Sequence, residues 1–277
     1  MHGRRLVTSA VSASAAALIG LGIIPAQAGA SVHSAHSKSP RGSASSASLP
    51  LIDHGGKVLT ASTTYAIWWG PQANFPSDAR TGIESLLSGF GGSNYLAIAN
   101  QYMRGGTANS KFEQSLLDPS TPPSHAPSTS TIVAEVGKVL NANGITPDPS
   151  GVYLVYTSNF PRVNYCAWHS AGSVGGITVQ VGYMPNSAGV AGCDPGNLYD
   201  SNSYSEGTRS LADSTAHEFM EATTDPVPLS GWADKNGQEI GDKCNFNYAS
   251  TVILANRSKW QLQQEWSNAA KGCVQGS

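Results

Sequence analysis

The sequence predicts a single domain of the α/β or α+β class, in which helices and strands are mixed. Short runs of β-branched and aromatic residues, such as TTYAIWWG at 63–70, are typical of buried strands. Elsewhere apolar residues recur at helical spacing, most clearly in a helix predicted late in the chain, over residues 205–222. The mixture of both periodicities in one chain indicates a mixed class.

The first half of the chain alternates predicted strand and helix. After the strand at 63–70, Ser77 can cap a helix whose apolar residues are Ile83, Leu86, Leu87 and Phe90. The elements expected next are a helical segment at about 94–103, a loop at 119–131 and a helix at 132–140.

The second half is expected to contain two further buried strands, GVYLVYT at 151–157 and ITVQVGY at 177–183. The helix at 205–222 follows them. Beyond it, the turn sequence Asp234-Lys235-Asn236-Gly237 leads into a short predicted strand at 239–242.

The N-terminus has the layout of a secretory signal peptide over residues 1–28. A basic pair, Arg4-Arg5, precedes an uncharged apolar run, and Ala26-Gln27-Ala28 provides a small-x-small cleavage site. Residues 29–50 are rich in Ser and Ala and cannot bury a core, so we expect a disordered tether or pro-segment there. Residues 51–277 then form one secreted domain.

Charge and cysteine content limit the partners and the compartment. The formal net charge is −2, and loss of Arg4 and Arg5 with the signal gives −2 − 2 = −4. With no basic cluster, nucleic acid and anionic membranes are poor partners. The four cysteines of an exported chain suggest two disulfides, for which we expect the local pairs Cys166–Cys193 and Cys244–Cys273.

The segment AHEFMEATTDP, residues 216–226, concentrates one imidazole and three carboxylates in a chain that is only 12% charged. On a helix, His217 and Glu221 are one turn apart and can reach the same ion, while Glu218 lies one step round the helix. This is the arrangement of zinc metallopeptidase helices of the His-Glu-x-x-His type, with Glu221 in place of the second His. The alternative is an ordinary helix whose polar face contacts only water.

A cation held by His217 and Glu221 needs a third ligand. Asp225 would stand about 12 Å from His217 on a continuous helix. Pro226 disfavours helix at Asp225, so the chain can turn back there. Asp225 is then either a ligand or the acceptor that holds the His217 ring. Zn²⁺ accepts a carboxylate ligand, and the added negative charge also suits Ca²⁺ or Mn²⁺.

Four segments resemble one known family. TAHEFMEATTDP, GWADKNGQEIGDKC and QQEWSNAAKGCV are similar to the C-terminal signature of secreted bacterial and fungal relatives of the plant phosphate-induced/EXORDIUM family. NYCAWHS, at 164–170, resembles the Cys-plus-His segment of the same family, and the similarity extends over about residues 63–274. The resemblance implies a zincin-like mixed sheet, with the active-site helix near 205–222.

The same resemblance implies roles for individual residues. His217 and Glu221 would be metal ligands, Glu218 the general base, and Asp242 or Glu239 the distal ligand. His169 is expected to be a buried structural histidine, with the polarisation of a substrate carbonyl as the catalytic alternative.

Two functions follow as hypotheses. The first is a secreted, monomeric, zinc metallopeptidase-like hydrolase that acts on a peptide or cell-wall substrate outside the cell. The second is a non-catalytic extracellular or cell-wall protein of the EXORDIUM type, in which the same residues hold a structural ion.

Overall fold

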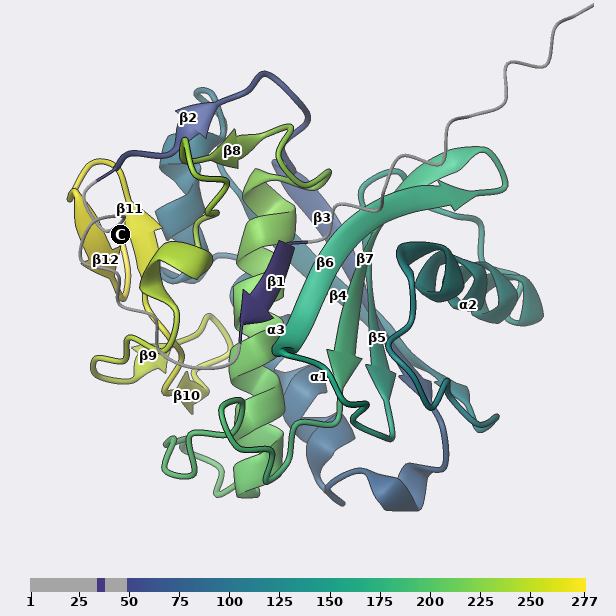
Figure 1. The fold of residues 1–277 in the computed structure, drawn as a ribbon. Helices are drawn as coiled ribbons and strands as arrows, with labels where there is room; N and C mark the ends of the chain where they lie inside the picture. Colours follow the sequence, from purple (N-terminus) through teal and green to yellow (C-terminus); the bar gives the residue numbers. More distant parts are fainter. Residues whose placement is uncertain (1–33, 38–48) are drawn as a thin grey trace, which may run out of the picture. The chain divides into compact units, whose positions relative to one another are not determined.

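The computed structural model describes residues 34–37 and 49–277, all of which fall in one unit (Figure 1). The predicted signal peptide, at 1–28, lies outside the described residues, as does most of the predicted tether at 29–50. Within that tether, Ser34–Ser37 forms strand β1. These four residues pair with the edge of the central sheet.

A six-stranded mixed sheet forms the centre of the unit, with the strand order β1-β6-β7-β5-β3-β4. Its parallel part is built from β3, β4, β5 and β7, whereas β6 runs antiparallel to β7 and β1 runs antiparallel to β6. The bounds of these strands are Ala61–Trp69 (β3), Asn109–Asp118 (β4), Gly151–Thr157 (β5), Tyr165–Val174 (β6) and Ile177–Pro185 (β7).

Helices cover both faces of the sheet. α2, Thr129–Ala142, packs on one face, and α1, Ala79–Phe90, and α3, Glu206–Thr224, pack on the other (Figure 1). The side chains of β3 alternate between the two apolar cores: Ile67 and Trp69 contact the α2 side, while Ala66 and Trp68 contact the α1 and α3 side. Successive side chains of a strand point to opposite faces of the sheet, so a strand that is buried on both faces contributes to both cores in alternation.

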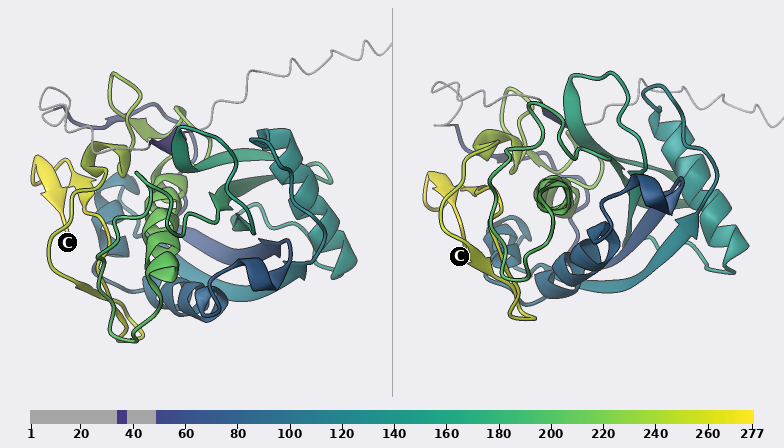
Figure 2. Two further views of the ribbon diagram at one scale, coloured as in Figure 1. Left: turned by 60° about the horizontal axis from the view of Figure 1, so that its bottom comes forward. Right: turned by 90° about the horizontal axis from the view of Figure 1, so that it is seen from below.

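The segment after α3 closes over the helix from the side away from the sheet. It holds short elements only: β8 (Trp232–Ala233, paired with β2, Ile52–Asp53), the 3₁₀ turn η3 (Asp242–Cys244), β9 (Val252–Ile253), β10 (Lys259–Trp260), β11 (Glu265–Ser267) and β12 (Gly272–Val274). In Figure 2 (right), which looks along α3, this segment and the sheet lie on opposite sides of the helix. α3 is therefore buried around nearly its whole circumference.

The mixed α+β class and most of the predicted elements are confirmed. The strands at 63–70, 151–157 and 177–183 correspond to β3, β5 and β7, and the late helix to α3. The segment at 94–103 is a 3₁₀ helix, η2 (Leu96–Tyr102), and a short 3₁₀ turn, η1 (Gln72–Asn74), follows β3. α2 begins at Thr129, inside the predicted loop, because the Ser128 hydroxyl accepts a hydrogen bond from the Thr131 N–H.

Of the six strands of the central sheet, β1, β4 and β6 were not predicted, and neither were the short strands β2 and β8–β12; the strand predicted at 239–242 is wrong. β4, at the sheet edge, is mostly polar and largely exposed, and β6 is rich in small and polar residues. In β6 a Cβ on Gly172 would lie 2.4 Å from a Val133 methyl of α2, so the absence of a side chain there permits close packing. Residues 239–242 form a loop that enters η3 instead of a strand, since their backbone serves the site described below.

Both local disulfides are confirmed, Cys166–Cys193 and Cys244–Cys273. Cys166 lies three residues before His169 in β6, and Cys244 ends the turn that begins at Asp242. Among residues 34–37 and 49–277, no helix combines the length and apolarity needed to cross a membrane.

Candidate metal centre

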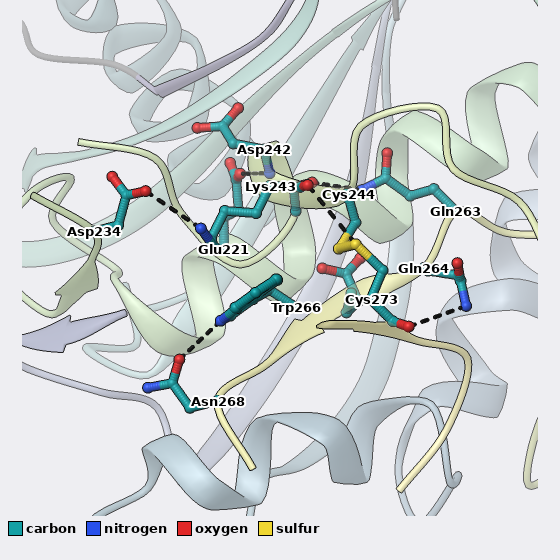
Figure 3. The surroundings of a disulfide bond; sticks show 12 residues. Glu221, Asp234, Asp242, Lys243, Cys244, Gln263, Gln264, Trp266, Asn268 and Cys273 are labelled. Atoms are coloured by element: carbon teal, nitrogen blue, oxygen red, sulfur yellow. Dashed lines mark hydrogen bonds and ion pairs between the residues drawn. A yellow bond between two sulfur atoms is a disulfide. The ribbon is translucent and has the colours of Figure 1, made fainter. Parts of the chain in front are cut away.

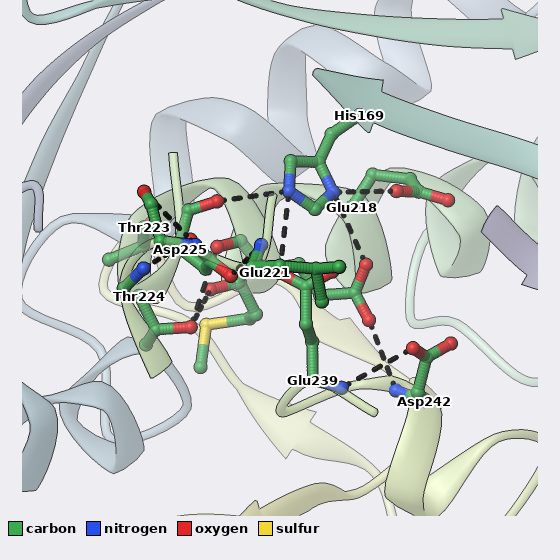
Figure 4. A network of polar contacts seen from close by, with 12 residues as sticks. His169, Glu218, Glu221, Thr223, Thr224, Asp225, Glu239 and Asp242 are labelled. Carbon is green, nitrogen blue, oxygen red and sulfur yellow. Dashed lines mark hydrogen bonds and ion pairs between the residues drawn. The ribbon is translucent and has the colours of Figure 1, made fainter. Parts of the chain in front are cut away.

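Acidic and imidazole side chains from separate elements meet between the sheet and the C-terminal segment (Figure 4). His169 comes from β6, and the helix α3 contributes His217, Glu218 and Glu221. Glu239 lies in the loop before η3, and Asp242 begins that turn. The structure thus brings together six of the seven residues that the sequence singled out.

The polar side of α3 does not face water. His217, Glu218 and Glu221 are all 0% exposed, as are His169 and Glu239. The interpretation as an ordinary solvated helix face is therefore wrong, because the C-terminal segment covers the side of α3 that the sheet leaves open. A buried charge is costly unless it is paired or binds a cation, so this burial demands an electrostatic partner for each group.

Glu221 is the carboxylate that the two imidazoles share. Its Oε1 lies 3.0 Å from Nε2 of His217, one helical turn away, and its Oε2 lies 3.3 Å from Nδ1 of His169. The backbone N–H of Asp242 also donates to Oε1, at 3.1 Å. Glu221 consequently links the helix, the sheet and the C-terminal segment through one carboxylate.

Two overlapping sets of buried ligand atoms surround Glu221. His169, Glu221 and Glu239 form one set, and His217, Glu218 and Glu221 form the other; within each set the atoms lie within 4.8 Å of one another. Imidazole nitrogen and carboxylate oxygen are ligands for Zn²⁺, Mn²⁺ and other divalent ions. These buried His and Glu groups could hold a metal ion, and Glu221 would be a ligand in either set.

Glu239 provides the strongest sign that the cluster suits a cation. Neither of its oxygens accepts a hydrogen bond from the described part of the chain, although the side chain is 0% exposed. Its Oε1 lies 3.5 Å from Nε2 of His169. Burial raises the pKa of Glu239 well above its usual value, which is the expected state of a carboxyl group that lacks sufficient positive charge around it.

The ring of His169 is oriented by the backbone. Its Nε2 lies 3.1 Å from the carbonyl oxygen of Asp225, so an Nε2–H proton donates there. In the neutral ring Nδ1 then carries the lone pair, and this nitrogen lies 3.3 Å from Oε2 of Glu218 as well as from Glu221. His169 is therefore part of the cluster and not a separate structural histidine.

Asp225 does not have either of the roles predicted for it. Its carboxylate accepts hydrogen bonds from the N–H groups of Leu229, at 2.6 Å, and Gly231, at 2.6 Å, and so shapes the turn after α3. It does return toward the site as Pro226 suggested, but through its backbone carbonyl, which contacts His169 and not His217.

Of the three distal candidates, Glu239 is the one that belongs to a ligand set. Asp242 lies farther off, with Oδ1 3.9 Å from Nε2 of His217 and Oδ2 accepting from the Glu239 N–H at 3.3 Å. Its side chain is 17% exposed, which makes it the group that extends from the cluster toward solvent. Burial, and then the charge of Glu221, raises the pKa of Asp242 to about 7.

In the absence of a cation the charges of the cluster stabilise one another. Burial alone would lower the pKa values of His169 and His217, but Glu239 and Glu221 raise both well above the usual histidine value. Burial opposes ionisation of Glu221, but His217 and His169 hold its pKa well below the usual range. The metal-free site is thus a buried set of ion pairs centred on Glu221.

Residues that the sequence did not indicate hold the site together. Asp213, one turn before His217, accepts from the Tyr248 hydroxyl at 2.6 Å and from the Gln263 N–H at 2.7 Å, which ties α3 to the C-terminal segment. Gly241 lies flat against His217, and a Cβ there would stand 2.9 Å from Nδ1. Both roles depend on contacts between residues distant in sequence, so spacing gave no signal of them.

The Cys244–Cys273 disulfide anchors the loop that supplies Glu239 and Asp242 (Figure 3). Beside it, Lys243 is buried: Nζ lies 3.3 Å from Oδ2 of Asp234 and 4.2 Å from the centre of the Trp266 ring. These contacts fix η3 against β11, so the acidic residues of the loop are held at the end of α3 by covalent and polar contacts together.

Comparison with known proteins gives no family. No protein-family model matches the chain. No curated protein matches it either. A chain of a solved structure described as "Structure of a chaperone-substrate complex" is similar over 61% of this chain, at 12% identity and a TM-score of 0.32. This chain spans 24% of the length of that one, and a likeness this weak shows neither fold nor function.

Replacement of Glu221 by Gln should destabilise the metal-free protein by about 3–5 kcal/mol, because both imidazoles lose their shared counter-charge in a buried site. Glu206→Gln is the matched control on the same helix: Glu206 pairs with Arg209 and is 29% exposed, so its loss should cost less than about 1 kcal/mol. Urea unfolding of the two variants measures the difference, and equal losses would contradict the central role of Glu221.

The stability of the metal-free protein should fall as pH rises from about 6 to about 8. The raised pKa values of His169 and His217 give a stabilisation that is full below about 6.5, the unfolded value, and is lost progressively as the pH rises from there through the raised folded values. Asp242, with a pKa of about 7, acts in the same direction because the folded state keeps a proton that the unfolded state has released. Melting temperatures of the chelator-treated protein check this, and a rise with pH would contradict it.

Proposed function

We propose that this protein is a secreted, metal-dependent hydrolase of the zinc metallopeptidase type. The single observation that carries the proposal is the buried cluster around Glu221, in which ligand-type nitrogens and oxygens from β6, α3 and the loop before η3 converge. The resemblance to secreted relatives of the EXORDIUM family supports a zincin-like assignment for the same residues.

In this proposal His217 and Glu221 from α3, His169 from β6 and Glu239 from the distal loop would hold the cation. Glu239 is preferred to Asp225 and Asp242 because it alone of the three belongs to a ligand set. A bound Zn²⁺, or Mn²⁺ or Ca²⁺ in its place, supplies a Lewis acid that polarises a carbonyl group and lowers the pKa of a nearby water.

Glu218 is the proposed proton acceptor. It directly precedes the apolar Phe219 on α3 and lies one step round the helix from His217, so it can stand beside the cation without coordinating it. In the metal-free site burial raises the pKa of Glu218. In the metal-free site Nδ1–H of the protonated His169 ring donates to Oε2 of Glu218, at 3.3 Å, so the carboxylate already lies beside the proposed ligand before a cation binds.

The expected substrate is a peptide or a cell-wall component outside the cell, cleaved by a monomeric protein without nucleic acid or membrane partners. The two disulfides support an oxidising compartment, and the signal peptide at 1–28 would direct the chain there.

A second function has one observation in its favour. All of the proposed ligands are 0% exposed, as in a structural site that is closed to solvent. The protein would then be a non-catalytic extracellular protein of the EXORDIUM type. Removal of a structural ion by a chelator would lower the melting temperature, whereas removal of a catalytic ion would abolish turnover and leave the fold largely intact.

Glu218→Gln should lower kcat for a mixed peptide substrate by about 10²–10⁴-fold, because the amide cannot accept a proton. Its metal content, measured by elemental analysis, should stay equal to that of the unmodified protein. Glu206→Gln, at the start of the same helix, serves as the control and should keep full turnover. Unchanged kcat in the Glu218 variant would contradict the hydrolase proposal and favour the structural ion.

A further inference from the structure

Strand β1 lies along the outer edge of β6, the strand that carries His169 of the candidate metal centre. Its residues pair antiparallel with β6 so that Ser34 is opposite His169, Ala35 opposite Trp168 and His36 opposite Ala167. β1 also contacts α3, the helix that carries the other cluster residues. Figure 1 shows β1 beside β6 and next to α3.

Without β1, β6 would be the edge strand of the sheet, since the strand order is β1-β6-β7-β5-β3-β4. An edge strand presents unpaired N–H and C=O groups that bind any extended polypeptide by main-chain hydrogen bonds. A chain bound to this edge necessarily passes His169, because that residue lies in the paired stretch. The edge of β6 is thus a site for an extended peptide beside the candidate catalytic groups.

β1, the strand that occupies this edge, is bound to β6 by few contacts. Within the described part of the chain four residues pair with β6, and the sequence of residues 31–50 contains no Phe, Trp or Tyr that could bury a large apolar surface. Such a short strand stays bound chiefly because it belongs to the same chain, which gives it a high effective concentration at the edge. It is therefore suited to displacement.

A substrate cannot reach the buried cluster unless part of the surrounding chain moves. His169, Glu218 and Glu221 are 0% exposed, yet a hydrolase must admit its substrate to these groups. β1 contacts both of the elements that carry them, β6 and α3. Removal of β1 would open the one edge of the sheet that passes the cluster.

We propose that residues 34–37 act as an intramolecular inhibitor that occupies the outer edge of β6, and that an extended peptide segment of the substrate takes their place there. The inhibitory role rests on the proposed hydrolase function, whereas the exchange of β1 for another peptide is a binding property that can be measured without turnover.

The test is a cut made after folding. In the full secreted chain, residues 42–48 are replaced with the recognition sequence of a site-specific protease, and the purified protein is cleaved there. The probe is a fluorescent synthetic peptide of residues 31–41, and its binding is followed by anisotropy at micromolar protein. Hydrogen exchange of the amides of residues 167–169 is measured in parallel.

Cleavage should release β1, because it removes an effective concentration worth about a hundredfold or more. The probe should then bind the cut protein and not the uncut one, the amides of residues 167–169 should exchange faster, and peptide turnover should rise about tenfold or more. A probe with Ala35→Pro and His36→Pro is the matched control and should not bind, since two successive prolines remove a ladder donor.

The results separate the two proposals. If the cut protein does not bind the probe and its β6 amides keep their protection, the inhibitor proposal is overturned, whatever the turnover. If the probe binds and turnover rises in a Glu218-dependent way, both proposals are supported. If the probe binds while cut and uncut proteins both lack turnover, the inhibitory role is overturned together with the hydrolase function, and a peptide-binding edge is what the experiment establishes.

Discussion

The structure depends on one constraint, the burial of opposite charges around Glu221. A carboxylate that is 0% exposed has to be compensated, and here two imidazoles and a backbone N–H from three different parts of the chain compensate it. His169 can reach it only if β6 packs on α3, and Asp242 only if the C-terminal segment closes over the helix. The packing of these three parts of the chain therefore also determines which groups surround Glu221.

The C-terminal segment covers α3 although it contains little secondary structure. Its strands have two or three residues each, so backbone pairing alone would hold it weakly. Asp213 binds it to the middle of α3, the Cys244–Cys273 disulfide closes it on itself, and Lys243 is clamped between Asp234 and Trp266. These contacts explain how a loop can present Glu239 without a hydrogen-bond partner for its carboxylate within the described residues.

Local patterns in the sequence predicted what local physics determines. β3, β5, β7 and α3 follow from residue type and periodicity, and the pairing of His217 with Glu221 follows from the pitch of a helix. The place of His169 in the cluster, the backbone role of Asp225 and the loop at 239–242 could not be predicted in this way. Each depends on which distant segment packs against it. The same holds for β1, whose Ser- and Ala-rich composition is typical of disorder, although its residues pair with the edge of β6.

X-ray absorption at the edge of the metal that copurifies with the secreted protein shows whether the groups around Glu221 bind a cation. We expect one tightly held divalent ion whose shell contains only nitrogen and oxygen at about 2.0–2.2 Å, with the outer scattering of imidazole rings. Absence of a stoichiometric metal, or a shell of oxygens without imidazole scattering, would contradict it. The buried charges around Glu221 would then be an ion-pair network with a structural purpose alone.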